Sequence, residues 1–153
     1  MRVFVVRHAH AGDRERWQGD DRQRPLSEKG RGQAAGLVRL LAEAEVGRIL
    51  SSPYLRCVQT VDPLARAVSV RVEPEPLLAE GGDWREVLKL ARDAMVPTVL
   101  CSQGDVIGDL VIDLVAQGLV QPSEARAQKG STWDLDIEDG RIVAVAYLPP
   151  PDA

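Results

Sequence analysis

Short apolar segments alternate with segments of helical periodicity along this chain, and this alternation restricts the fold more than any other feature. The apolar runs at 2–6 (RVFVV), 48–51 (RILS) and 97–101 (PTVLC) predict buried strands, because strands covered on both faces are continuously apolar. A helical pattern capped by Ser27 and ended by Gly47 separates the first two runs. The sequence therefore predicts an α/β fold, a three-layer α/β/α sandwich around a mostly parallel sheet.

Local signals place the other elements. Ser52-Pro53 is typical of a helix start, and Pro63 predicts that this helix kinks or ends there. Asp139-Gly140 is a strong hairpin signal, which predicts a late antiparallel piece of the sheet. Further elements are expected at the following positions: strands at 70–72, 131–137 and 141–147, a helix that begins near Asp83, and a helix that follows 102–104 and ends at Gly118.

The chain has 153 residues, which is the length of one domain. We expect a single domain over residues 1–148, followed by a proline-rich tail at 149–153 that frays. The polar stretch 12–24 is expected to be a functional loop, because loops of this length in compact domains usually have a function. No apolar run approaches the ~18 residues of a membrane span, and residues 1–6 lack the features of a signal peptide. These features favour a cytoplasmic protein.

Charge and cysteine content exclude several classes of function. The net charge of −4 argues against nucleic-acid binding, which needs a basic face. Cys57 and Cys101 are too few and too far apart for a zinc site, and we expect them to be reduced, buried thiols.

Polar residues follow the predicted strands at their carboxyl ends. Arg7 and His8 follow the first strand, Arg56 lies in the first turn of the helix after the second, and 102–104 (SQG) lies at a helix N-terminus. The carboxyl ends of parallel strands meet at one edge of a sheet, where ligands bind. Arginine fits phosphate oxygens bidentately, and a helix N-terminus favours an anion. The sequence therefore predicts a phosphate site at this edge, where a nearby carboxylate would be the natural proton donor; the segment after the third strand brings Glu80 there.

Several motifs resemble those of the histidine phosphatase superfamily, which includes phosphoglycerate mutases and SixA-type phosphohistidine phosphatases. Residues 6–9 (VRHA) are similar to the family's RHG/RHA signature, and residues 51–60 (SSPYLRCVQT) to its SSPxxRxxQT motif. Residues 77–81 (LLAEG) resemble the segment that carries the family's acid, and 99–104 its last motif. The matches occur in order over nearly the whole chain, and its beginning is most similar to small bacterial members. The resemblance implies a phosphoglycerate mutase-like fold.

The resemblance also implies roles for the site residues, without a metal or a cofactor. His8 would attack phosphorus and carry the phosphoryl group, and an imidazole is a competent nucleophile near neutral pH. Arg7 and Arg56 would hold the phosphoryl oxygens. Glu80 would protonate the leaving group and then activate water. Further substrate contacts are predicted at Arg14, Gln103 and Gly104.

Some of these assignments leave alternatives open. Glu75 and Asp83 lie close enough in the sequence to compete with Glu80 as the acid. Arg14 either contacts substrate or is simply a solvated loop arginine. His10 either lines the mouth of the pocket or takes the part of a second histidine. Trp17, in the polar loop, either contacts substrate or anchors the loop.

The sequence departs from the family pattern at Gln103, where the last motif normally carries a second histidine. The chain has only two histidines, His8 and His10. Glutamine keeps an N–H donor but brings no positive charge. Loss of one transition-state donor typically costs ~2.7–4 kcal/mol, and the remaining amide places the cost at or below the lower end. We therefore expect slower turnover, with phosphate binding retained better.

The sequence predicts a phosphatase for a phosphomonoester or phosphohistidine, acting on a phosphorylated small molecule or a phosphoprotein. The loop 12–24 is the expected specificity element. Gln103 keeps open a second class, a non-catalytic pseudophosphatase that binds a phosphorylated partner. The retained His8, Arg7 and Arg56 argue against that class. A mutase is disfavoured because the short chain has little room for the insertions that cover a mutase pocket.

Overall fold

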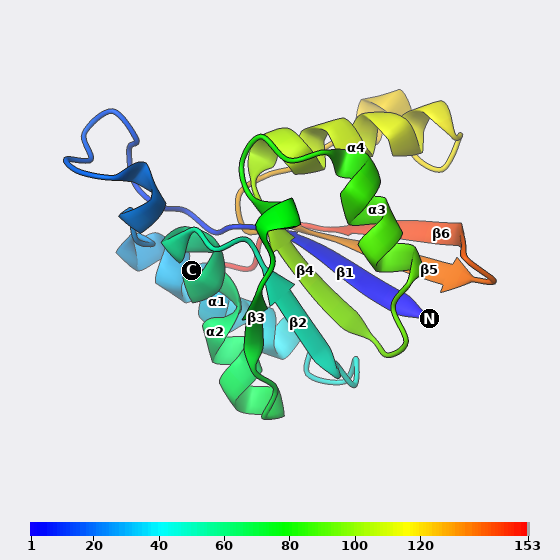
Figure 1. Ribbon diagram of the computed structural model, residues 1–153, viewed down its shortest axis with the longest axis horizontal. Helices are drawn as coiled ribbons and strands as arrows, with labels where there is room; N and C mark the ends of the chain where they lie inside the picture. The colour runs from blue at the N-terminus through cyan, green and yellow to red at the C-terminus, as the bar shows by residue number, and fades with distance from the viewer. Residues whose placement is uncertain (153) are drawn as a thin grey trace.

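The computed structural model describes residues 1–152 and contains a single mixed sheet (Figure 1). In this part of the chain, six strands lie in the order β3-β2-β4-β1-β5-β6. The first four strands in this order are parallel to one another, whereas β5 is antiparallel to β1 and β6 to β5. This confirms the predicted, mostly parallel sheet with a late hairpin. The strands are β1 (Arg2–Arg7), β2 (Arg48–Ser51), β3 (Val72–Pro74), β4 (Thr98–Ser102), β5 (Thr132–Glu138) and β6 (Arg141–Leu148).

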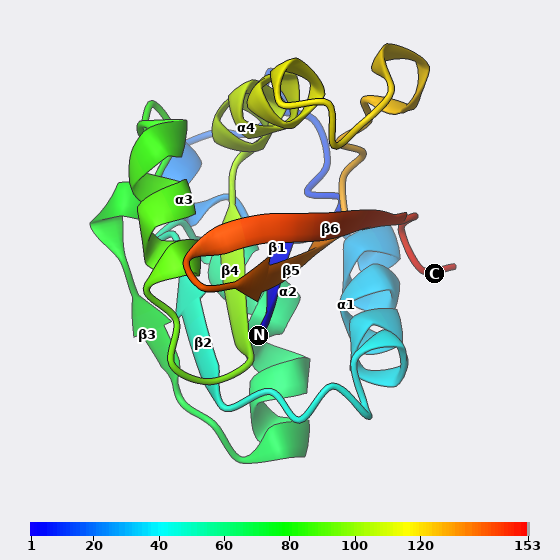
Figure 2. The ribbon, with the colours of Figure 1, turned by 90° about the vertical axis from the view of Figure 1, so that its right-hand side faces the viewer.

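Helices cover both faces of the sheet, as the three-layer prediction requires (Figure 2). Helices α1 (Glu28–Leu40) and α2 (Leu55–Val68) lie on one face, and α3 (Trp84–Arg92) and α4 (Gly104–Ala116) on the other. Three short 3-10 helices, η1 (Asp21–Gln23), η2 (Pro76–Leu78) and η3 (Pro122–Glu124), complete the elements of the described residues. None of the helices within residues 1–152 combines the length and the apolarity that crossing a bilayer requires.

The central strand β1 shows why this sequence forms three layers. Val3 and Val5 belong to the apolar cluster under α3 and α4, whereas Phe4 and Val6 belong to the cluster under α1 and α2. Successive side chains of a strand point to opposite faces, so an unbroken apolar run supplies both cores at once. All four side chains are completely buried.

Two element boundaries differ from those predicted. Helix α2 begins at Leu55, because the Ser52 hydroxyl accepts the N–H of Tyr54 in a turn before the helix (3.2 Å). The helix also continues through Pro63 to Val68, so the prediction that it ends at Pro63 is wrong. The buried residues on both sides of Pro63 pack on the sheet, and this packing outweighs the one lost helical hydrogen bond.

The remaining differences are small. Helix α1 ends at Leu40 instead of at Gly47, and the third strand lies at 72–74 instead of 70–72. The hairpin turn is as predicted, since Asp139 (φ 50°) and Gly140 (φ 71°) both adopt the left-handed conformation that a tight hairpin favours. Pro151 of the predicted fraying tail lies directly against α1, where a Cβ at Gly36 would collide with it.

Candidate active site

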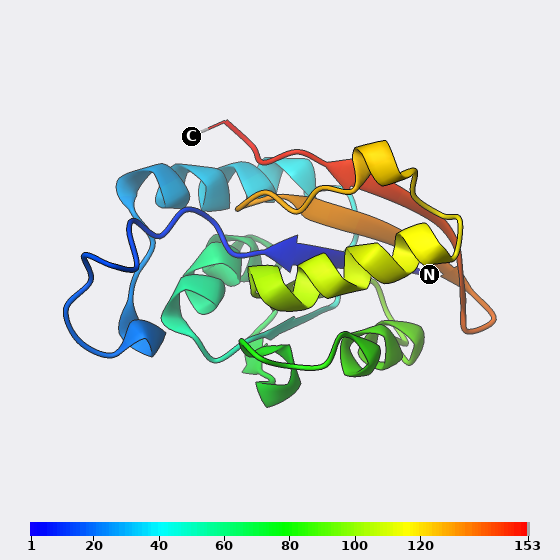
Figure 3. The ribbon, with the colours of Figure 1, turned by 90° about the horizontal axis from the view of Figure 1, so that it is seen from above.

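The predicted site residues lie together at the carboxyl edge of the parallel strands. His8 directly follows β1, Gln103 directly follows β4, and Arg56 lies in the first turn of α2. The backbone of His8 is fixed from two sides: its N–H donates to Ser102 O (3.2 Å), and its carbonyl accepts the N–H of Gly130 (3.0 Å). Figure 3 shows the loop after β1 leading away from this edge toward α1.

The hydrogen bond of the His8 ring fixes its tautomer. Nδ1 lies 2.8 Å from Ala9 O, and a carbonyl only accepts, so Nδ1 carries the proton in the neutral ring. Nε2 therefore keeps its lone pair. The ring is 5% exposed, and burial lowers the pKa of His8 to about 3, assisted by the positive charges of Arg56, Arg7 and Lys129 and opposed by the bond to Ala9. His8 is thus neutral near pH 7, the form that a nucleophile needs.

Arg7 reaches the site past a glycine that has no room for a side chain. Its NH1 donates to Ala127 O (2.6 Å), which anchors one end of the guanidinium. A Cβ atom at Gly104 would lie 2.6 to 2.8 Å from the guanidinium atoms of Arg7. Glycine at the first residue of α4 therefore lets the guanidinium lie directly against the N-terminus of this helix.

Arg56 is completely buried, and its two terminal nitrogens are held by one residue of the polar loop. NH1 donates to Asp21 O (2.8 Å), and NH2 to Asp21 Oδ2 (3.1 Å). The guanidinium carbon lies 4.9 Å from the centre of the Tyr54 ring, within the range of a cation–π contact. NH2 also lies 3.9 Å from Glu80 Oε1.

Unpaired buried polar atoms gather at this site. In residues 1–152, the buried side-chain nitrogen and oxygen atoms without a hydrogen-bond partner are Arg7 Nε, Arg56 Nε, Gln103 Nε2, Gln103 Oε1 and Thr132 Oγ1. Four of these five atoms belong to predicted site residues, and three of the four are nitrogen donors. Because buried polar groups are nearly always hydrogen-bonded, a group of free donors on neighbouring segments is suited to an anion rich in oxygen atoms.

The structure separates Glu80 from the two acids that could compete with it. The Glu75 side chain caps η2, and the Asp83 side chain caps α3. Glu80 Oε1 instead accepts a hydrogen bond from Arg14 NH2 (2.5 Å) and faces Arg56. Of the three carboxylates, Glu80 is therefore the one placed among the arginines. Arg14 is likewise part of the cluster and not an isolated loop arginine.

His10 does not replace the missing second histidine. Its Nδ1 lies 2.6 Å from Ser27 Oγ at the start of α1, whereas Gln103 precedes α4. This bond ties the segment after β1 to α1.

Sequence reasoning missed three charged residues of this site. Asp21 and the buried Arg24 lie in the polar loop, and Arg24 donates to Asp21 Oδ1 (3.0 Å) and Ala11 O (2.6 Å). Lys129 lies close enough that its charge contributes to the lowered pKa of His8. Burial lowers the pKa of Lys129 itself, and neighbouring arginines lower it further. The polar composition of the loop could have indicated Asp21 and Arg24, but no local pattern indicates Lys129.

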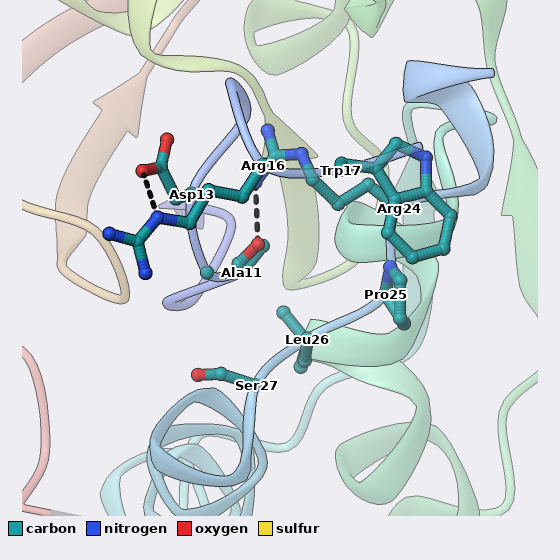
Figure 4. Close-up of a pocket in the computed structure, with 9 residues that line it drawn as sticks. Ala11, Asp13, Arg16, Trp17, Arg24, Pro25, Leu26 and Ser27 are labelled. Carbon is teal, nitrogen blue, oxygen red and sulfur yellow. Dashed lines mark hydrogen bonds and ion pairs between the residues drawn. The ribbon is translucent and has the colours of Figure 1, made fainter. Parts of the chain in front are cut away.

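The polar loop forms a pocket of its own, lined in part by Arg24 (Figure 4). This cavity of about 260 Å³ is lined by residues 11–13, 16–17 and 24–27. Trp17 lines it, and the indole N–H donates to Asp20 O (2.9 Å), so Trp17 anchors the loop. In Figure 4 the Arg24 guanidinium points at Ala11 along one side of the pocket, with Pro25 and Leu26 opposite.

Comparison with known proteins places this site in a family. The model of the histidine phosphatase superfamily (branch 1) matches residues 3–98, which is more than half of the chain. The chain belongs to the histidine phosphatase superfamily. This confirms the family predicted from the motifs around His8 and Arg56.

Individual relatives of this superfamily agree with that assignment. The 8-oxo-(d)GTP phosphatase of Mycolicibacterium smegmatis is 39% identical over 157 residues, which cover 98% of this chain and 48% of the relative. The chain thus spans about half of that relative's length. A SixA protein histidine phosphatase complexed with tungstate superposes with a TM-score of 0.76 (22% identity, 99% of this chain and 97% of that chain). A putative phosphohistidine phosphatase SixA from Agrobacterium tumefaciens gives 0.77 (23% identity, 97% of each chain). The predicted phosphoglycerate mutase-like fold is confirmed, and the likeness to the SixA proteins is a likeness of fold.

Proposed function

We propose that this protein is a metal-independent phosphatase that hydrolyses a phosphomonoester or phosphohistidine through a phosphorylated His8. The cluster of free donors carries the proposal. Arg7 Nε, Arg56 Nε and the amide of Gln103 are buried and unpaired beside an imidazole whose Nε2 is unprotonated. These groups provide what an in-line phosphoryl transfer needs, a nucleophile and fixed donors for the phosphoryl oxygens.

In the first step, the lone pair of His8 Nε2 forms a bond to phosphorus, and the bond from phosphorus to the leaving atom breaks. The protonated carboxyl group of Glu80 gives its proton to the leaving atom. The resulting phosphoimidazole is a cation that keeps its Nδ1–H, and the carbonyl of Ala9 at 2.8 Å stabilises it. In the second step, water attacks phosphorus, the carboxylate of Glu80 takes the proton, and His8 leaves as a neutral ring.

Arg14 must change partners during this cycle. In the free protein its NH2 donates to Glu80 Oε1 (2.5 Å), and this ion pair occupies the carboxylate. A dianionic phosphoryl group is a stronger acceptor for the guanidinium than one carboxylate. We therefore assign Arg14 to substrate binding: its transfer to the phosphoryl group releases Glu80 to carry the proton.

Gln103 and Gly104 complete the phosphate site. Gln103 directly precedes α4, so its side-chain amide lies beside the free backbone N–H groups of the helix. Together they supply donors on the side of the site opposite α2. The amide lacks the charge of an imidazolium, and we therefore expect phosphate binding to be retained better than turnover.

The substrate is a phosphorylated small molecule or a phosphoprotein side chain. The similar proteins are named for the nucleoside triphosphate 8-oxo-(d)GTP and for phosphohistidine, which are both phosphoryl compounds. The loop that carries Asp21, Arg14 and the Trp17 pocket borders the phosphate cluster, so we propose that it selects the substrate. We further propose that the protein acts in the cytoplasm.

Gln103 also favours a second candidate function, a pseudophosphatase that binds a phosphorylated partner without turnover. A binder needs the donors of Arg7 and Arg56, but it does not need a neutral nucleophile with a fixed tautomer. Binding of phosphate or vanadate is expected of both functions, whereas a covalent phosphohistidine is expected of the enzyme alone.

The deciding experiment combines turnover with trapping. We expect hydrolysis of p-nitrophenyl phosphate and an acid-labile, base-stable phosphoprotein after rapid quenching, both abolished in His8→Ala. Vanadate binding measured by calorimetry shows that each protein keeps its phosphate site. If the protein binds vanadate but yields neither product nor phosphoprotein, the pseudophosphatase is the correct function.

A further inference from the structure

Asp21 of the polar loop contacts Arg14, Arg24 and Arg56, and the phosphatase chemistry above gives this carboxylate no role. Its carboxylate accepts from Arg24 Nε (3.0 Å) and Arg56 NH2 (3.1 Å), and it lies 3.8 Å from Arg14 Nε. Its backbone carbonyl accepts a further hydrogen bond from Arg56 NH1 (2.8 Å). One loop residue thus contacts three arginines, one of which is completely buried.

These contacts form a closed ring of alternating charges. Arg56 lies between Asp21 (3.1 Å) and Glu80 (3.9 Å), and Arg14 lies between the same two carboxylates (3.8 and 2.5 Å). Each arginine is therefore pulled from two sides. Without the charge of Asp21, both guanidinium groups would be drawn toward Glu80 alone.

The geometry of Arg56 shows what the Asp21 contacts do. A guanidinium presents two usable edges, the end edge with both terminal nitrogens and the side edge with Nε and NH2. Asp21 holds both terminal nitrogens, one through its backbone and one through its side chain. Arg56 Nε is left buried and unpaired. Asp21 therefore fixes the two terminal nitrogens and leaves Nε free for an anion.

We propose that Asp21 is a positioning residue, which orients Arg56 so that its Nε edge binds the phosphoryl group. This inference rests on the phosphate site of the proposed function, but not on turnover. The ionisation of Asp21 supports it: burial opposes the charge, yet the hydrogen bond from Arg24 and the charges of Arg56 and Arg14 lower the pKa of Asp21. The carboxylate is therefore charged at neutral pH.

The opposite interpretation, in which Asp21 competes with phosphate for Arg56, makes the opposite prediction. A competitor would cover the donors that phosphate needs, and its removal would tighten phosphate binding. A positioning residue leaves those donors free, and its removal weakens binding. The sign of the change in affinity therefore separates the two interpretations.

The first measurement compares Asp21→Asn with Asp20→Asn. Asp20 is a matched control, because it lies one residue earlier, caps η1 and pairs with Arg22 without a contact to Arg56. We expect Asp21→Asn to weaken the binding of inorganic phosphate about tenfold, the effect of losing one charged hydrogen bond, and Asp20→Asn to change it less than twofold. We expect Asp21→Glu, which keeps the charge, to restore most of the affinity.

A second readout needs no ligand. The Nε–H of Arg56 is buried and should give a distinct, sharp signal in an arginine-selective ¹⁵N NMR spectrum, assigned by its loss in Arg56→Lys. We expect this signal to broaden or move in Asp21→Asn and to remain in Asp20→Asn. A purely structural role of Asp21 would lower the melting temperature but would not change this signal in the folded protein.

A double-mutant cycle links the two residues. If Asp21 acts through Arg56, Asp21→Asn in an Arg56→Lys background should weaken phosphate binding less than twofold further. Tighter phosphate binding in Asp21→Asn, or an unchanged affinity with an unchanged Arg56 signal, would overturn the inference. If the variants show these effects but the wild-type protein forms no phosphoprotein, the proposed catalysis is overturned and the role of Asp21 stays intact.

Discussion

Replacing Gln103 with histidine should raise kcat for a small aryl phosphate by about 10- to 100-fold. The Gln103 side chain is 1% exposed, and both of its amide atoms lack a partner, so a substituent of similar reach meets no competing hydrogen bond. A histidine there supplies a donor that becomes positively charged. The change therefore adds charge to a position where the wild-type protein has only a neutral donor.

The magnitude follows from what the amide already does. A neutral hydrogen bond contributes about 0.5–1.5 kcal/mol net, and a charge-assisted one about twice as much; the larger of these differences, about 1.5 kcal/mol, sets the lower value of the expected gain near tenfold. The complete loss of a transition-state donor costs ~2.7–4 kcal/mol, and its lower end puts the upper limit near 100-fold. Burial and the arginines that lower the pKa of His8 to about 3 would act on the new histidine too. Its charge therefore depends on bound phosphoryl, and the gain appears in kcat more than in KM.

Steady-state hydrolysis of p-nitrophenyl phosphate measures this gain, with His8→Ala as the blank and Gln103→Ala as the matched loss of the donor. We expect the order of kcat to be histidine, glutamine, alanine at position 103. If Gln103→His folds and binds phosphate as the wild type does but gains nothing, position 103 does not contact the transferring phosphoryl group. The assignment of the last motif would then be wrong.

Three further predictions follow from single contacts. Gly104→Ala places a Cβ 2.6 Å from the guanidinium of Arg7 and should weaken phosphate binding, measured by calorimetry, about tenfold. In the control Gly108→Ala on the same helix, the Cβ meets nothing within 4 Å, so the melting temperature should rise and the affinity for phosphate should not change. Because folding lowers the pKa of His8 from 6.5 to about 3, the unfolded chain binds the extra proton, and the free energy of unfolding should fall by up to about 1.4 kcal/mol per pH unit from pH 6.5 down to 3. Urea titrations should show a weaker dependence of this free energy on pH for His8→Ala, and an equal dependence would contradict the lowered pKa. Trp17→Ala opens the loop pocket and should raise KM for a nucleoside monophosphate more than for p-nitrophenyl phosphate; equal effects would mean that Trp17 only anchors the loop.

The sheet and the gathering of polar residues at its carboxyl edge could be predicted from the sequence because both depend on local patterns. The run at 2–6 is apolar at every position except the first, and this pattern alone specifies a strand buried on both faces. The convergence of Arg7, Arg56 and Gln103 then follows from one rule, the common edge of parallel strands. The end of α2 could not be predicted in the same way. The low helix propensity of proline favours an end at Pro63, but the burial of neighbouring residues lets the helix continue to Val68.

The partners of the arginines could not be predicted, because they depend on the tertiary path of an irregular loop. Asp21 is 35 residues from Arg56, and no periodicity connects them. The choice of Glu80 over Glu75 and Asp83 also needed coordinates, since all three carboxylates occur within nine residues. Helix capping separates them, because two of these side chains satisfy backbone N–H groups and the third does not. Capping of η2 was invisible in the sequence, because a one-turn helix leaves no periodic pattern.

If the proposed function holds, the contacts of Asp21 also connect recognition of the phosphoryl group with recognition of the rest of the substrate. Arg24 bonds both to Asp21 and to Ala11, and it lines the pocket beside Trp17. Asp21 in turn bonds Arg56, so a displacement of the loop by the organic part of a substrate would shift the Arg56 guanidinium as well. A rigid sheet edge supplies His8 at a fixed position, whereas the loop sets how Arg56 meets the phosphoryl oxygens. Contacts between a substrate and the loop would thus improve the orientation of Arg56 at the reacting phosphorus, so that they raise kcat and not only the affinity for the substrate.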